Sequence, residues 1–155
     1  MSYVHMIEEA ASRFSIDPSV DLDMTGMSIV SGWSILEAES KDLGYDVLRN
    51  ITEIRPLVHR LMEPLHSVPY VSHLYDVDQL IYKDKEYGGS WIRRGGVGAF
   101  FTAVRKYDRI EHQLSRSGDS LKKAIEIDSR EEGILDDIGD LRRYLILWEA
   151  WWMSL

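Results

Sequence analysis

The helical spacing of the apolar residues is the feature that most limits how this chain can fold, and it is clearest near the C-terminus. Between residues 130 and 152, apolar side chains recur every three or four positions, as on one face of a helix: Ile134, Ile138, Leu141, Leu145, Trp148 and Trp152. The strict alternation typical of β-strands is almost absent from the chain. The sequence therefore predicts an all-α protein, a multi-helix bundle.

Helical patterns also cover residues 3–14, about 33–65, about 76–83 and about 98–115, whereas residues 15–32 read as a loop. Pro56 and Pro64 should begin, kink or end helices within the second of these segments. There is no internal repeat or linker. We expect a single domain over residues 1–155, with N-terminal helices in residues 1–70 and a functional core in residues 75–152.

Composition narrows the class of protein. With 155 residues, of which 45% are hydrophobic, the chain is long enough to bury a core. The net charge of −8 argues against direct binding to duplex nucleic acid or to an anionic membrane. No cysteine is present, so disulfides, thiolate catalysis and Cys-based zinc sites are excluded. The chain has neither a membrane-length apolar stretch nor a secretory signal, so we expect a cytoplasmic protein.

Two pairs of carboxylates fall on predicted helices: Asp108 with Glu111, and Asp137 with Asp140. At about 100° per residue, both pairs touch the helix faces that the apolar residues mark for burial. Buried carboxylates are rare unless they are paired or bind a metal. Two inward-facing pairs therefore predict a site for a hard divalent cation, Mg²⁺ or Mn²⁺ in its place.

Glu132 and Asp136, four residues apart at the start of the last helix, are candidate outer ligands of the same cation. The Ser129-x-x-Glu132 capping box alone would also explain Glu132. The alternative for the inner acids is ion pairing with neighbouring arginines. Those pairs would be Asp108 with Arg105 or Arg109, and Asp140 with Arg142 or Arg143.

The run Arg93-Arg94-Gly95-Gly96-Val97-Gly98 leads directly into the helix that carries the first acid pair. Small residues let backbone N–H groups approach an anion, and an adjacent arginine can grip a phosphate with two donors. The run is not a GxxxxGK[ST] loop. We expect Arg94, Gly95, Gly96 and Gly98 to bind phosphate; the alternative is a simple surface turn.

Two further groups could contact a nucleotide. Arg105, Lys106 and Arg109 lie on the predicted helix of the first acid pair, where they could reach phosphates or form a solvated polar face. Tyr87 and Trp91 could stack on a base, or could pack in the core.

Residues 75–150 resemble the nucleotide modification associated domain 1 family, which is met often in bacteriophages; the first 70 residues are not covered. The likeness is carried by Lys83-Asp84, Tyr87-Gly88, Ser90-Trp91, Arg94 to Gly98, Arg105 to Glu111 and Asp136 to Tyr144. This resemblance implies a role in phage nucleotide metabolism, in the host cytoplasm.

The layout is also similar to that of the MazG-like all-α nucleotide pyrophosphohydrolases, which hold magnesium against a triphosphate with ExxE and ExxD pairs. Here the pairs are Asp108-x-x-Glu111 and Asp137-x-x-Asp140, each with Asp in place of Glu at its first position. The resemblance implies a homodimer or homotetramer with sites between packed helices.

Together these patterns predict a Mg²⁺-dependent (deoxy)nucleoside triphosphate pyrophosphohydrolase that releases a monophosphate and pyrophosphate. Arg94 and the glycine amides would hold phosphates, Arg105, Lys106 or Arg109 would balance developing charge, and Glu111 would accept a proton from water. One alternative is a non-hydrolytic nucleotide-binding accessory protein of a phage DNA base-modification pathway. Another is a helical oligomerisation domain whose acids are only salt-bridged.

Overall fold

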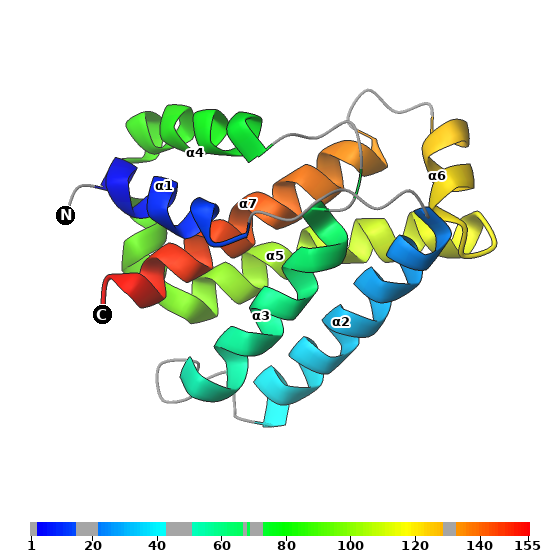
Figure 1. Cartoon of the computed structure of the whole chain (residues 1–155), viewed down its shortest axis with the longest axis horizontal. Coiled ribbons are helices and arrows are strands. Elements are labelled where there is room, and N and C mark those ends of the chain that lie inside the picture. Colours follow the sequence, from blue (N-terminus) through cyan, green and yellow to red (C-terminus); the bar gives the residue numbers. More distant parts are fainter. Residues whose placement is uncertain (1–2, 15–21, 43–50, 67, 69–72, 129–132) are drawn as a thin grey trace.

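The computed structural model describes residues 3–14, 22–42, 51–66, 68, 73–128 and 133–155, which form seven α-helices and no strand (Figure 1). The helices are α1 (Tyr3–Ser12), α2 (Leu22–Asp42), α3 (Ile51–His66), α4 (His73–Tyr87), α5 (Ser90–Arg116), α6 (Leu121–Ile127) and α7 (Ile134–Met153). The all-α expectation is confirmed. Within these residues, no helix is long and apolar enough to cross a membrane.

Helix α7 lies at the centre of the bundle. It contacts α1, α3, α4, α5 and α6. Figure 1 shows α5 running lengthwise beside it, α4 along one side, and α2 and α3 paired on the other. Most residues of α7 are buried, and they lie on all faces of the helix, as expected of a core helix. The C-terminal tryptophans Trp148, Trp151 and Trp152 belong to this core.

Four charged residues of α7 are also buried, and Glu149 shows how such a charge is accommodated. Its carboxylate is fully buried and accepts hydrogen bonds from Arg55 Nε at 3.0 and 3.1 Å, while His59 Nε2 lies 2.9 Å away. Burial alone would raise the pKa of Glu149, but the hydrogen bonds and charges of His59 and Arg55 outweigh it and lower the pKa. This cluster attaches α3 to α7.

Helix α2 begins at Leu22, so the expectation of a loop through residue 32 was wrong. The glycines that suggested a loop serve helix packing instead. A Cβ at Gly26 would lie 3.1 Å from the Leu121 Cβ, and a Cβ at Gly32 would lie 3.2 Å from a Leu61 methyl group. The missing side chains therefore let neighbouring helices approach α2 closely.

Helix α5 begins eight residues earlier than the expected start at Gly98, because two helical segments meet in it at Gly95. Gly95 has φ 64° and ψ −162°, a backbone region that is essentially restricted to glycine. The indole of Trp151 packs against this bend: a Cβ at Gly95 would lie 3.2 Å from Cζ2 and 3.3 Å from Nε1. The glycine run is thus a kink within a helix, packed on the core.

Candidate functional site

A pocket of about 310 Å³ lies between α4, α5 and α7. This volume falls near the lower end of the range for small-molecule sites. The lining combines apolar, aromatic and charged side chains: Leu80, Lys83 and Asp84 from α4; Ser90, Trp91, Arg94, Gly95, Gly98, Ala99 and Thr102 from α5; and Asp140, Arg143, Tyr144, Leu147 and Trp151 from α7.

Five residues singled out in the sequence meet in this pocket: Trp91, Arg94, Gly95 and Gly98 from α5, and Asp140 from α7. The base-stacking candidate, the phosphate-binding run and one acid of the second pair therefore share a single cavity. They converge because α5 and α7 pack side by side along their lengths.

Asp84 organises the turn that connects α4 to α5. Its Oδ1 accepts hydrogen bonds from the Gly89 backbone N–H and from Trp91 Nε1, both at 3.0 Å. Gly88 and Gly89 have φ values of 58° and 72°, which side-chain-bearing residues rarely adopt. The turn and its aspartate thereby fix the indole of Trp91 at the pocket wall.

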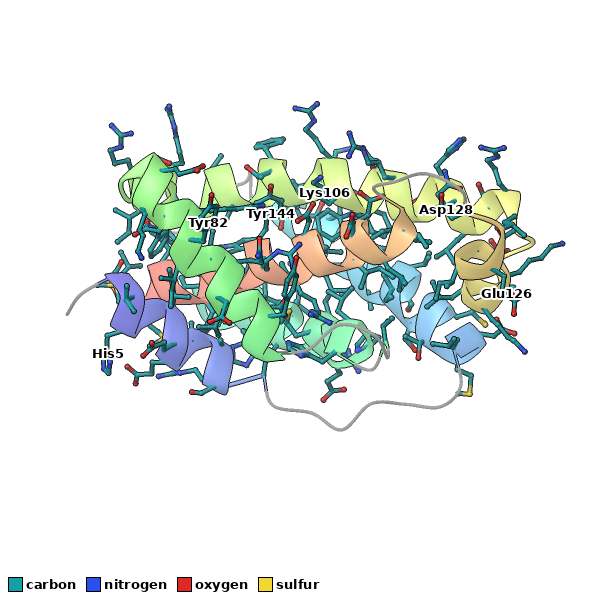
Figure 2. All side chains as sticks on the ribbon, turned by 90° about the horizontal axis from the view of Figure 1, so that it is seen from above. His5, Tyr82, Lys106, Glu126, Asp128 and Tyr144 are labelled. Atoms are coloured by element: carbon teal, nitrogen blue, oxygen red, sulfur yellow. The ribbon has the colours of Figure 1, made fainter. Side chains whose placement is uncertain are left out.

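Asp140 stands between two cations at the α5–α7 side of the pocket. Its carboxylate contacts Lys106 Nζ at 2.9 Å and Arg143 NH2 at 2.5 Å. Burial alone would raise the pKa of Asp140, but the hydrogen bonds and charges of Arg143 and Lys106 lower it. Figure 2 shows Lys106 and Tyr144 along the seam between α5 and α7. Asp140 is therefore ionised and paired. Its ion pair with Arg143 is one of the two pairings that the sequence offered as the alternative to metal binding.

Asp76 of α4 extends this network, although sequence reasoning did not single it out. Its fully buried carboxylate accepts hydrogen bonds from Arg142 Nε at 2.9 Å and NH2 at 2.6 Å, and from Arg143 NH1 at 3.2 Å. The available signal was its position one turn before Leu80, on the inward face of α4.

The four candidate metal ligands do not converge in this arrangement. Asp137 is 1% exposed, and one of its oxygens lies 3.6 Å from Arg109 NH1. Asp108 and Glu111 are exposed, whereas the sequence placed them at the buried face of their helix. Among the described residues, no group of three or more His, Asp or Glu side chains could hold a metal ion.

After the kink at Gly95, the buried stripe of α5 consists of Phe100, Ala103, Tyr107, Ile110 and Leu114. At about 100° per residue, Glu111 lies at one edge of this stripe, next to Phe100, and Lys106 lies at the opposite edge. Lys106, and not the glutamate, therefore faces Asp140 on α7.

The remaining predicted residues lie around or outside the pocket. Gly96 is buried, Arg105 is exposed on α5, and Asp136 is exposed in the first turn of α7. None of these three lines the pocket. The side chain of Tyr87 and all of Glu132 lie outside the part of the chain that the structure describes.

Comparisons of the chain with family models, with curated proteins and with solved structures found no match.

Proposed function

We propose that this protein binds a nucleoside phosphate in the pocket between α4, α5 and α7. The observation that carries the proposal is the lining itself. Three cations, Lys83, Arg94 and Arg143, share one cavity with the indoles of Trp91 and Trp151, in a chain whose net charge is −8. Cations gathered beside aromatic surfaces in an otherwise acidic protein favour an anionic ligand with a planar apolar part.

The two parts of a nucleotide match different parts of the lining. Trp91 is half-buried and its ring nitrogen is bound to Asp84, so its orientation is set before a base arrives. Stacking of a base on such a ring contributes about 1–3 kcal/mol. Lys83 and Arg94 are exposed at the pocket, where they can donate to phosphate oxygens.

Magnesium-dependent release of pyrophosphate stays a prediction from the resemblance and is not part of this proposal. The described carboxylates do not form a cation cage: Asp137 and Asp140 contact cations, while Asp108 and Glu111 are exposed.

Calorimetric titration tests the proposal, with a nucleoside and its mono-, di- and triphosphates, each with and without Mg²⁺. We expect saturable binding of the nucleotides. Arg94→Ala should weaken it about tenfold, the equivalent of one charge-assisted hydrogen bond. Arg93→Ala is the matched control, because Arg93 is exposed, adjacent and absent from the lining. Absence of nucleotide binding, or equal losses in both variants, would refute the site.

Chromatography of the same mixtures separates binding from hydrolysis. Recovery of intact triphosphate supports the proposal as stated. Formation of monophosphate and pyrophosphate with Mg²⁺ would instead establish the pyrophosphohydrolase activity expected from the resemblance.

A further inference from the structure

Arg143 is the most buried cation of the pocket lining. Its side chain is 9% exposed, whereas Lys83 and Arg94 are exposed. NH1 donates to Asp76 Oδ1 at 3.2 Å and NH2 donates to Asp140 Oδ1 at 2.5 Å. Its Nε–H is buried and has no hydrogen-bond partner in the described part of the chain. A buried guanidinium with an unused donor has capacity for a further acceptor.

The two carboxylates around Arg143 are each shared with another cation. Asp76 also binds Arg142, and Asp140 also contacts Lys106. Each carboxylate therefore balances the charge of Arg143 only in part. A buried charge without full compensation is costly, and an anionic ligand group in the pocket would offset that cost.

The guanidinium of Arg143 is also held in place. Its NH1 and NH2 pack over Gly139, where a Cβ would lie 3.1 and 3.3 Å from them. Its Cζ lies 5.7 Å from the centre of the Tyr75 ring. A fixed, planar fork of donors matches the geometry of phosphoryl oxygens and loses little freedom when it binds them.

We infer that Arg143 is the interior binding residue for a phosphoryl group of the ligand, and that Asp76 is its positioning residue. This inference rests on the proposed function and adds to it. Lys83 and Arg94 bind phosphate at the exposed part of the pocket, whereas Arg143 binds the phosphoryl group that enters the interior.

The experiment compares a nucleoside with its 5′-mono-, di- and triphosphates, and with inorganic phosphate and pyrophosphate, by calorimetry. Arg143→Lys keeps the charge but removes the planar fork. We expect it to weaken binding of phosphorylated ligands about tenfold and to leave nucleoside affinity unchanged. Arg116→Lys, at an exposed position at the end of α5, is the matched control and should bind every ligand as the wild type does.

Asp76→Asn tests the positioning role and should reproduce the phosphate-specific loss. Circular dichroism checks that this variant folds; if it unfolds, Arg143→Lys still decides the inference. Wild-type affinity of Arg143→Lys for phosphorylated ligands would overturn the inference while leaving the nucleotide site intact. So would an equal loss for nucleoside and nucleotide, which indicates a purely structural role. A wild-type protein that binds none of the ligands would refute the site as well.

Binding of pyrophosphate but no nucleotide would distinguish the source of the phosphoryl group. It would support Arg143 as the anion-binding residue and refute the nucleotide part of the proposed function.

Discussion

Replacing Gly95 with alanine, at the kink inside α5, should destabilise the protein more than the same change at Gly88. Gly95 has φ 64° and ψ −162°, and its missing side chain faces the indole of Trp151 at 3.2–3.3 Å. Trp151 is only 6% exposed and belongs to the core, so it cannot swing away into solvent. Alanine at this position would have an unfavourable backbone conformation, and its methyl group would crowd the Trp151 indole.

The two penalties can be sized separately. A residue forced into this glycine-specific region costs about 1–3 kcal/mol. Adding a methyl group to a packed contact costs about 1–3 kcal/mol more. We therefore expect Gly95→Ala to lower the free energy of unfolding by at least about 2 kcal/mol. For a chain of 155 residues, that loss corresponds to a fall in Tm of roughly 4–8 °C.

Urea and thermal unfolding, followed by circular dichroism, measure the loss. Gly88→Ala is the matched control, because Gly88 has φ 58° but nothing lies within 4 Å of its missing side chain. The free energy of unfolding of that variant should fall only by the cost of a left-handed backbone, about 1–2 kcal/mol. If Gly95→Ala lost no more than Gly88→Ala, the packed contact with Trp151 would carry no energy and the reasoning would be refuted.

Three further changes test the site and the core. Gly98→Ala should lower the free energy of unfolding measured in urea, because the added methyl group would overlap the Arg94 Cβ. Alanine is favoured over glycine in a helix by about 1 kcal/mol, so a gain in stability would contradict this geometry. Asp84→Ala removes the acceptor of two N–H groups. It should cost about 1–3 kcal/mol and weaken nucleotide binding, whereas Asp78→Ala, exposed on the same helix, should change neither. Glu149 has a lowered pKa in the folded state, so its stabilisation is present above its ordinary value of 4.5 and is lost as pH falls below it. Wild-type unfolding free energy should therefore fall with acid more steeply than that of Glu149→Gln; parallel pH profiles would exclude this ion-pair contribution.

The helices were predictable where apolar spacing alone defines them. The last helix was placed correctly from residues 134 to 152, because its apolar residues repeat over five turns. Residues 22–32 were not, because Gly26 and Gly32 read as loop formers in isolation. Their role in close helix packing depends on Leu121 and Leu61, which are distant in the sequence.

The pocket residues, too, include some that local sequence motifs reveal and others whose contacts depend on tertiary packing. Local motifs in the sequence singled out Trp91, Arg94, Gly95 and Gly98, and all four line the pocket. Arg143 was among the expected partners of Asp140, because the two residues are three apart on one helix. The contact of Asp140 with Lys106 could not be derived, because it depends on which stripe of α5 packs against α7. Asp76 and Arg143 are 67 residues apart, so no periodicity connects them.

The charged residues inside α7 have a consequence for how much of the chain can exist alone. Residues 75–152 contain every residue that lines the pocket, yet the carboxylate of Glu149 is paired with Arg55 and His59, from the N-terminal half. A fragment limited to residues 75–152 would leave the Glu149 carboxylate without these partners, and it would uncover the face of α7 on which α1 and α3 pack. We therefore expect residues 75–152 alone to fold less stably than the whole chain, because the N-terminal helices supply the partners of a charge in the last helix.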